Sequence, residues 1–432
     1  MTSRRMTVLA ALVVGLGASL TVPAAAAPPT LKTPFEASNG AAWTTLPEEA
    51  AFLGKVAAGS RRVKIDQIGS TVQGRPIQLV QIAEPGPRPA PAVAAGSVVL
   101  FICSQHGDEP AGREGCLSRI RDLAFSRDAE TVRMLRSTTV LFVPTANPDG
   151  RVADTRGNAN GVDINRDHIA LATLEARAMA KVFKDYKPDI VHDLHEYGTT
   201  PPYYTKDVTW LWPRNLNVAD RVHDESEKLS RDYARVAVES AGHTSGVYGI
   251  WTDPNTGEPI KQTAGDGQER ILRNTSGLKH AVGMLLESAV DPKNDAEKAD
   301  PALNARRRVH SHLVSVDGTL KMARERRAQI ELATTLSRNL EPFKSKPIYF
   351  GGADNQAPEP DEVLSTPPCG YRLTTPQFQH VRQTLELHDV HSWPVGDGRF
   401  VPLAQQARGL IPLLLDAKGQ YEITAAERVG TC

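Results

Sequence analysis

Residues 97–110 read SVVLFICSQHGDEP, an unbroken apolar run followed by a polar turn that carries His106 and Glu109. The run has the length of a buried strand and is rich in β-branched and aromatic residues, so we expect a strand at 97–103. Pro110 then suits the first position of a helix. In open α/β sheets, ligands bind beyond the carboxyl ends of the strands. His106 and Glu109 are therefore candidate metal ligands.

Three further short apolar runs follow in the chain, at residues 138–144 (TTVLFVP), 189–194 (DIVHDL) and 281–287 (AVGMLLE). Helical patterns alternate with them, at residues 110–125, 171–186 and 218–239. This alternation predicts an α/β fold with a mixed, mainly parallel central sheet flanked by helices. Two more strands, at 63–68 and 77–82, are separated by glycines and a proline and are typical of a hairpin.

The composition narrows the class of protein. The chain has 432 residues, of which 40% are hydrophobic and 23% charged, which is a globular balance and excludes disorder as the dominant state. Fifty basic residues balance fifty acidic ones, so no net charge favours nucleic acid or an anionic membrane. We expect neither as a partner.

The first thirty residues, MTSRRMTVLAALVVGLGASLTVPAAAAPPT, have the pattern of a secretory signal peptide. Arg4 and Arg5 precede an apolar run that is shorter than the ~20 residues a membrane span needs. The small residues that follow favour cleavage near Ala26 or Ala27. We therefore expect a secreted protein with no membrane span.

The chain has four cysteines, which in an exported protein allow two disulfides with three alternative pairings. Cys103 and Cys116 bracket the turn with the candidate ligands, while Cys369 and Cys432 both lie near the carboxyl terminus. Pairing within each set is the simplest prediction.

Polar side chains also follow the other apolar runs. The second run leads to Asn147 and a Gly- and Asn-rich loop at residues 156–167, the third ends in HDLHE at 192–196, and the fourth ends on Glu287. Four strands thus deliver polar or ionisable groups to one edge of the predicted sheet. Two histidines and a glutamate satisfy a catalytic zinc site, in which water takes the fourth position.

From about residue 45 to 288 the sequence resembles a zinc carboxypeptidase of the carboxypeptidase A type, the M14 metallopeptidase family. HGDE at 106–109 resembles the HxxE motif of the family, and NPDG (147–150), RGNANGVDINR (156–166) and DLH (193–195) follow in the family order. Glycines 69 and 74 with their neighbours resemble its entry hairpin.

The resemblance implies that His106, Glu109 and His195 bind one zinc ion per chain. His192 competes with His195 for the third position, but residues three apart on a strand face opposite sides, and the DLH match selects His195. Asp163 is implied as the carboxylate that orients the first ligand histidine.

The implied reaction is hydrolysis of a C-terminal peptide bond. Zinc polarises the scissile carbonyl and lowers the pKa of bound water, while a carboxylate takes the water proton and returns it to the leaving amine. We predict Glu287 as this general base, because an apolar strand would otherwise end unusually on a carboxylate. The resemblance implies Arg156 as the oxyanion stabiliser and Asn165 with Arg166 as the clamp for the terminal carboxylate, which arginine binds bidentately.

The chain departs from the family pattern at one position. The family places a mobile tyrosine shortly before the base, where this chain has Gly-Asp-Gly-Gln at 265–268. Tyr248 is the best candidate for this substrate-capping role, with loop packing as the alternative. The floor of the side-chain pocket should lie between residues 251 and 274, a range that includes both acids and bases. The residues concerned are Asp253, Asp266, Glu269, Arg270 and Arg273. The side-chain preference is therefore open.

Four segments are expected along the chain. They are a signal peptide (1–27), a zinc carboxypeptidase-like catalytic domain (28–298), a long helical connector weakened near Gly318 (299–341), and a small C-terminal accessory module (342–432) that begins with a Pro-rich stretch.

The favoured interpretation is a secreted, monomeric zinc metallocarboxypeptidase that acts on peptides or proteins with a free C-terminus. One alternative keeps the metal and changes the substrate: a zinc-dependent deacylase or a cell-wall peptide amidase. A noncatalytic peptide-binding protein on the same scaffold is the alternative from another class, and it would require a broken site.

Overall fold

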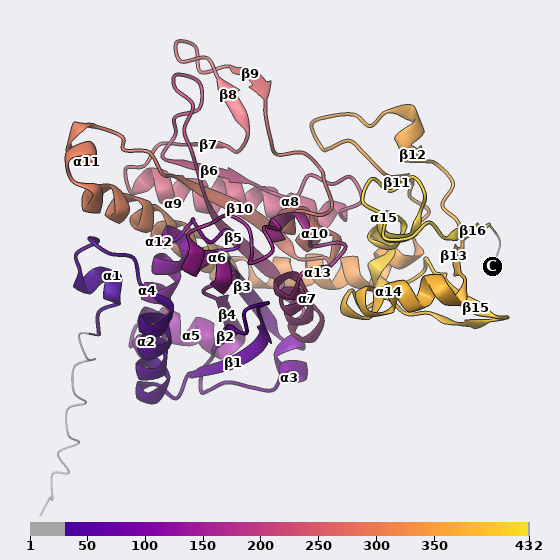
Figure 1. The fold of residues 1–432 in the computed structure, drawn as a ribbon, viewed down its shortest axis with the longest axis horizontal. Helices are drawn as coiled ribbons and strands as arrows, with labels where there is room; N and C mark the ends of the chain where they lie inside the picture. The colour runs from indigo at the N-terminus through magenta and orange to yellow at the C-terminus, as the bar shows by residue number, and fades with distance from the viewer. Residues whose placement is uncertain (1–30, 431–432) are drawn as a thin grey trace, which may run out of the picture. The chain divides into compact units, whose positions relative to one another are not determined.

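The computed structural model describes residues 31–430, in which an eight-stranded mixed sheet forms the centre of the fold (Figure 1). The predicted signal peptide and Cys432 lie outside the described residues. The strand order is β1-β2-β4-β3-β5-β10-β6-β7. Their bounds are β1 Val63–Ser70, β2 Pro76–Ile82, β3 Ser97–Cys103, β4 Thr138–Val143, β5 Ile190–Tyr197, β6 Val208–Leu211, β7 Ser245–Val247 and β10 Val282–Ala289.

The four middle strands, β4, β3, β5 and β10, are parallel to one another. The strands β1, β2 and β6 add antiparallel pairs on either side. Every residue of the four parallel strands is buried, which explains why they read as continuous apolar runs rather than as an alternation. The predicted mixed, mainly parallel sheet is confirmed, and so is the hairpin of β1 and β2.

Two strands are longer than the sequence predicts. The run at 189–194 is expected to end at the polar HDLHE segment, but β5 continues to Tyr197, and β10 continues past Glu287 to Ala289. The parallel backbone pairing persists because the polar side chains here find partners within the protein. His195 and Glu287 are therefore neighbours inside the sheet, paired in register.

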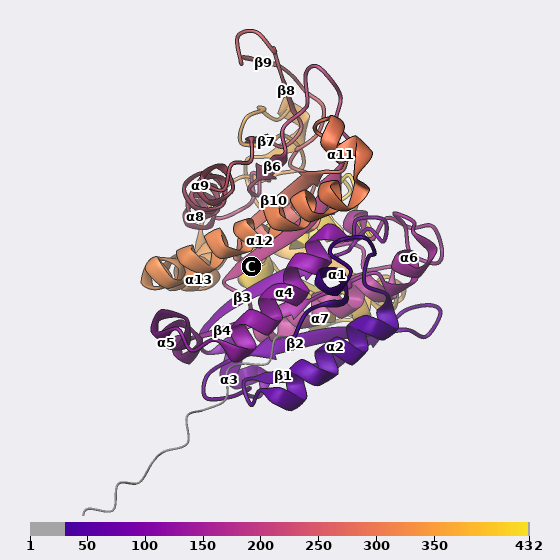
Figure 2. The same cartoon turned by 90° about the vertical axis from the view of Figure 1, so that its left-hand side faces the viewer.

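Helices cover both faces of the sheet. On one face α4 (Ala111–Phe125) and α12 (Pro301–Glu325) pack side by side across the strands (Figure 2). On the other face α7 (Leu174–Tyr186) buries Met179 and Val182 against β3. The remaining helices are α1 Pro34–Ala37, α2 Leu46–Gly59, α3 Ala90–Ala94, α5 Ala129–Ser137, α6 Pro148–Ala153, α8 Asp220–Lys228, α9 Arg235–Ser240, α10 Leu272–Leu278, α11 Asp295–Ala299, α13 Arg327–Leu340, α14 Thr375–Leu387 and α15 Ile411–Leu415. A π-helical segment, Leu229–Ala234, joins α8 to α9.

The prediction that the long helix is weakened near Gly318 is wrong. Helix α12 runs straight through this residue, and the chain breaks instead at Arg326, before α13 begins. A Cβ atom at position 318 would lie 2.8 Å from the carbonyl oxygen of Tyr233 and 3.1 Å from the Cα of Ala234. Glycine therefore serves to bring α12 close to the π-helical segment.

The predicted disulfide between Cys103 and Cys116 is present and joins the end of β3 to α4. The pairing of Cys369 with Cys432 stays a prediction, since Cys432 lies outside the described residues.

Residues 342–430, the C-terminal region, contain a four-stranded antiparallel sheet in the order β14-β15-β13-β16. Its strands are β13 Gly370–Leu373, β14 Trp393–Val395, β15 Gly398–Pro402 and β16 Glu427–Val429, and short strands elsewhere are β8 Ile250–Thr252, β9 Pro259–Gln262, β11 Ile348–Tyr349 and β12 Val363–Leu364. Its core, including Tyr371 and Leu413, is continuous with Val222 and Leu278 from the preceding part of the chain. The predicted domain boundaries remain predictions.

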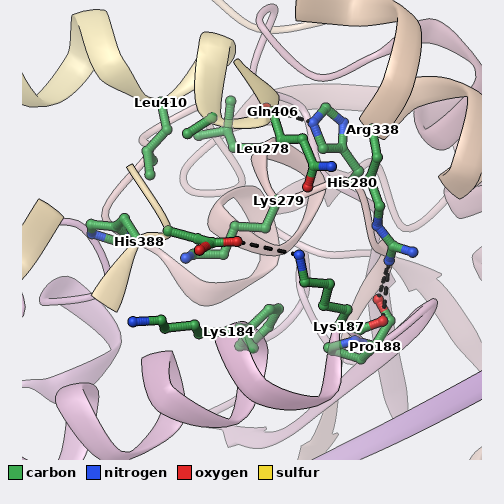
Figure 3. A pocket seen from close by; sticks show the side chains of 13 residues that line it. Lys184, Lys187, Pro188, Leu278, Lys279, His280, Arg338, His388, Gln406 and Leu410 are labelled. Atoms are coloured by element: carbon green, nitrogen blue, oxygen red, sulfur yellow. Dashed lines mark hydrogen bonds and ion pairs between the residues drawn. The ribbon is translucent and has the colours of Figure 1, made fainter. Parts of the chain in front are cut away.

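A small cavity of about 50 Å³ lies where α7, α10 and α13 meet the C-terminal region (Figure 3). His280 lines it, and its Nε2 donates to the carbonyl oxygen of Gln406 at 2.8 Å. Within the described chain, the Nδ1 atom of His280 has no hydrogen-bond partner. Burial lowers the pKa of His280 to about 4.

We expect His280 to make the fold sensitive to acid. Its imidazole is neutral in the folded protein, whereas the unfolded chain takes up a proton near pH 6.5, so stability falls as the pH drops from about 6.5 to about 4. This shift corresponds to about 3 kcal/mol at pH 4. The variant His280→Asn should reduce the acid-induced loss of unfolding free energy by that amount, measured by urea denaturation at pH 7 and pH 4. Asparagine tolerates the positive φ of 63° at this position.

His223 provides a control, because its protonation should stabilise the folded protein, whereas protonation of His280 should destabilise it. A hydrogen bond to Asp354 raises its pKa, so it stabilises the fold below about pH 6.5 and this contribution disappears as the pH rises through the folded-state pKa. The variant His223→Asn should therefore enlarge the acid-induced loss. An unchanged loss in His280→Asn would contradict the assignment.

Candidate metal centre and active site

Three predicted ligands converge at the carboxyl edge of the middle strands. His106 and Glu109 lie in the turn between β3 and α4, and His195 lies near the end of β5. The Nδ1 atom of His106 is 2.7 Å from Glu109 Oε1 and 3.0 Å from His195 Nδ1, and His195 Nδ1 is 2.8 Å from Glu109 Oε2. All three side chains are buried, and their ligand atoms lie within 4.8 Å of one another.

The far nitrogen of each histidine contacts a carboxylate. His106 Nε2 is 3.0 Å from Asp163 Oδ1, and His195 Nε2 is 2.9 Å from Asp193 Oδ2. A carboxylate at the outer nitrogen fixes the tautomer in which Nδ1 carries the free lone pair, which is the form that binds a metal. The structure thus places Asp163 as the sequence predicts and adds Asp193, which sequence reasoning missed.

This donor set fits a zinc ion. Two imidazole nitrogens and one carboxylate are typical of catalytic zinc sites, and donors around a tetrahedral zinc lie about 3.3 Å apart, since each bond is ~2.0–2.1 Å long. The distances of 2.7–3.0 Å between the donor atoms are close to this spacing. A small outward movement of the side chains accommodates the ion.

The charges in the site favour the anionic form of the carboxylates. Burial raises the pKa of Glu109, but the charges and hydrogen bonds of His106 and His195 outweigh it and hold the pKa well below the usual value. Asp163 follows the same pattern, because His106 and Arg156 outweigh its partial burial and lower its pKa. Both carboxylates are therefore available as anions next to a cation.

Two glycines allow the loops of the site to touch. A Cβ atom on Gly107, in the HGDE motif, would lie 1.9 Å from the carbonyl carbon of Gly150 in the NPDG motif. Asn147 accepts a hydrogen bond from the Gly150 N–H at 2.9 Å and so begins α6. At Gly150 a Cβ atom would lie 2.4 Å from Asn147 Nδ2 and 2.6 Å from the Gly157 carbonyl oxygen, so both positions require glycine.

Glu287 lies beside the three ligands. It pairs in register with His195 on the adjacent parallel strand, is 7% exposed, and interacts electrostatically with Glu109, His195 and Arg156. Burial and the charge of Glu109 raise the pKa of Glu287. A carboxyl group of raised pKa next to a metal site suits proton transfer near neutral pH.

The predicted oxyanion stabiliser, Arg156, reaches the same centre. Its Nε donates to Asp163 Oδ2 at 3.0 Å, and its Nη1 lies 3.4 Å from Glu109 Oε1. The side chain is 47% exposed, so it borders the open side of the site. A cavity of about 530 Å³ also opens next to Glu109, and Glu196 and Arg308 line it as well.

The two residues of the predicted clamp differ in their surroundings. Asn165 is buried, accepts from the Leu272 N–H at 2.9 Å, and its Nδ2 is 3.0 Å from His195 Nε2. Arg166 is half-buried and donates to the carbonyl oxygen of Asn165 at 2.9 Å. Asn165 thus lies between the Leu272 backbone and a metal ligand.

Tyr248 lies near the predicted base. The charge of Glu287 and burial raise the pKa of its phenol, which also interacts electrostatically with Arg273 and Arg166. The structure therefore places Tyr248 in the neighbourhood that the sequence argument assigns to the substrate-capping residue.

His192 faces away from the metal ligands, as the alternation along a strand predicts. Its Nδ1 is 3.0 Å from the Thr319 hydroxyl on α12, and its ring packs against Phe101. The same alternation places Asp193 and His195 on one face, and this signal was available to identify Asp193 from the sequence. Behind Asp193, Gln105 donates to its carboxylate at 2.7 Å.

Part of the chain matches a known protein family. Residues 50–257 match the family model described as zinc carboxypeptidase. Over these residues the chain is similar to zinc carboxypeptidases. The match includes the three ligands and the clamp, while Glu287 lies beyond it.

Curated relatives bear carboxypeptidase names. The chain is 30% identical over 190 residues to Carboxypeptidase 2 of Trichophyton tonsurans, which covers 42% of this chain and 35% of that protein. It is 34% identical over 116 residues to Carboxypeptidase E of Caenorhabditis elegans, covering 23% and 24%. The chain thus spans about a third of the length of the first of these relatives.

The solved structures to which the chain is similar include proteins named as carboxypeptidases. One is the enzyme of Pseudomonas aeruginosa in complex with (2-guanidinoethylmercapto)succinic acid, at 19% identity and a TM-score of 0.49, covering 66% of this chain and 70% of that one. Another is carboxypeptidase A of Helicoverpa armigera, at 15% identity and a TM-score of 0.49, covering 66% and 75%.

Asp193 provides a test of the metal centre. We expect Asp193→Asn to weaken zinc binding by ~10- to 100-fold, because the His195 imidazole loses the charged partner that orients it. A competition titration with a chromophoric chelator measures this directly. Asp416→Asn, a buried carboxylate bound to Tyr371 in the C-terminal region, should leave zinc affinity unchanged. Equal affinity in both variants would exclude a role for Asp193.

Proposed function

We propose that the protein is a secreted zinc metallocarboxypeptidase that hydrolyses C-terminal peptide bonds with Glu287 as general base. The observation that carries the proposal is the convergence of His106, Glu109 and His195 beside Glu287 and within reach of Arg156. The family of the matched domain and the names of its relatives support the same reaction class.

Each side chain has a separate task in this reaction. A bound zinc ion supplies Lewis acidity, which polarises a carbonyl and lowers the pKa of water. Glu287 accepts the water proton and later delivers it to the leaving amine, a task that its raised pKa favours. Arg156 stabilises the negative charge that develops on the carbonyl oxygen.

The free C-terminus of the substrate is held by Asn165 and Arg166. Arg166 is half-buried and makes no ion pair among the described residues, so its guanidinium is available to a carboxylate. Tyr248 closes the other side of the bound residue, next to Glu287. An enzyme that reads the terminal carboxylate in this way releases residues one at a time.

Export of the protein rests on the signal-peptide pattern of residues 1–27 and on the disulfide between Cys103 and Cys116. None of the helices between residues 31 and 430 has the length and apolarity needed to cross a membrane. We propose a monomer that carries one zinc ion.

Matched peptides with free and amidated C-termini test the proposal. The purified protein should shorten only the free peptides, stepwise, and a zinc chelator should stop the reaction, as followed by mass spectrometry. Equal shortening of both sets would exclude the clamp of Asn165 and Arg166. No cleavage of either set by zinc-loaded protein would instead favour the deacylase or cell-wall amidase alternative.

The role of Glu287 has its own test. Glu287→Gln keeps the shape of the side chain and removes the base, so we expect kcat to fall by ~100-fold or more while KM changes little. Zinc content, measured by elemental analysis, should stay at one ion per chain. Full activity in this variant would assign the proton transfer to another group.

A further inference from the structure

Two arginines in the site lack a carboxylate partner. Among residues 31–430, neither Arg166 nor Arg273 forms an ion pair. Arg214, the other arginine close to Arg273, is paired with Asp354 at 3.2 Å and lies over the ring of Trp212. Arg166 is already assigned to the terminal carboxylate, which leaves Arg273 without a function.

Arg273 is almost completely enclosed. It lies in the first turn of α10, is 1% exposed, and donates one hydrogen bond, from Nη2 to the carbonyl oxygen of Asp266 at 2.6 Å. Its Nε has no partner within the described part of the protein. The buried guanidinium therefore has an N–H donor without a hydrogen-bond partner in the described part of the protein.

Arg273 lies close to residues that the proposed function assigns to substrate binding. Arg273 interacts electrostatically with Tyr248, Asp266, Arg214 and Arg166. The phenol of Tyr248 in turn interacts with Glu287, Arg273 and Arg166. Arg273 and Arg166 thus lie near the same tyrosine, which is itself next to the general base. Under the proposed function, this neighbourhood is the one assigned to the last residue of the substrate.

A buried arginine without an anion is costly. Arginine is almost never fully buried unless it is paired, and an uncompensated buried charge is strongly destabilising. Burial, with the nearby charges of Arg214 and Arg166, outweighs the opposing effects of Tyr248 and Asp266 and lowers the pKa of Arg273 to about 10, so the group stays charged at neutral pH. An anionic group from outside the chain would relieve this situation.

We propose that Arg273 binds the side-chain carboxylate of an acidic C-terminal residue, so that the preferred substrates are peptides that end in glutamate or aspartate. The two unpaired guanidiniums then match the two carboxylates of such a residue: Arg166 holds the terminal carboxylate and Arg273 holds the side chain. This inference rests on the proposed carboxypeptidase activity and names its substrate class.

The competing role for Arg273 is structural. Its hydrogen bond to Asp266, together with those from Asn274 to Asp266 and Gln268, holds the loop before α10 in place. A purely structural arginine would affect stability and leave the choice of substrate unchanged. Substrate selectivity therefore separates the two roles.

Peptide pairs that end in glutamate or glutamine provide the measurement, because the two side chains have the same shape and differ in charge. For the zinc-loaded wild-type protein we expect kcat/KM to be at least ~100-fold higher for the glutamate peptide. Arg273→Met should bring this ratio close to one while the glutamine peptide is still cleaved. Arg273→Lys should retain part of the preference, because it keeps the charge.

Arg408 offers a matched control. It is also buried and also donates to a main-chain carbonyl oxygen, that of Lys346, at 2.6 Å. Arg408→Met should leave the ratio of the two peptides at the wild-type value. Thermal unfolding of each variant separates a loss of folding from a loss of selectivity.

Each outcome has one meaning. Equal cleavage of both peptides by the wild-type protein, or an unchanged ratio in a folded Arg273→Met, overturns the inference. An equal loss on both peptides in that variant also overturns it, because Arg273 would then serve the terminal carboxylate. If wild-type protein with bound zinc cleaves no peptide, including those that end in leucine or lysine, the proposed function itself fails. A wild-type ratio well above one that falls close to one in Arg273→Met, falls only in part in Arg273→Lys, and stays unchanged in Arg408→Met supports the inference. If Arg273→Met does not fold, the wild-type ratio and the partial loss in Arg273→Lys still test it.

Discussion

The parallel pairing of β3, β5 and β10 is the constraint on which the site depends. It brings the turn with His106 next to His195, and places Glu287 in register with His195. The backbone groups of these strands are satisfied by one another, so the polar side chains at their ends need only find one another. They do so through the contacts of Asp163 and Asp193 with the two histidines. A catalytic centre of charged groups is thereby held at the edge of an apolar sheet.

Much of this arrangement was predictable from the sequence. The four runs of buried strand residues define the middle of the sheet because both faces are covered, and the motifs follow them directly. The HGDE and DLH motifs predicted His106, Glu109 and His195 as ligands of one metal. In the structure their ligand atoms lie within 4.8 Å of one another. The alternation of side chains along a strand correctly separated His192 from the ligands.

The remaining features depend on tertiary contacts that local patterns do not report. Strand β5 continues through polar residues because their partners come from distant segments, such as Gln105 for Asp193. Gly318 suggests a weak helix when considered alone, but it is the point at which α12 meets the π-helical segment. The sequence lists Arg273 among acids and other bases, and only its burial without an ion pair distinguishes it.

The disulfide between Cys103 and Cys116 gives the ligand turn a covalent boundary. It joins residues that are thirteen positions apart in the sequence, and the segment between them contains both His106 and Glu109. Closing so short a loop removes much of its conformational freedom from the unfolded chain. The turn is therefore restrained at its two ends by a covalent bond that involves no metal. Thiol oxidation thus restricts this turn without the metal, and reduction of the disulfide would release that restraint on two of the three candidate ligands.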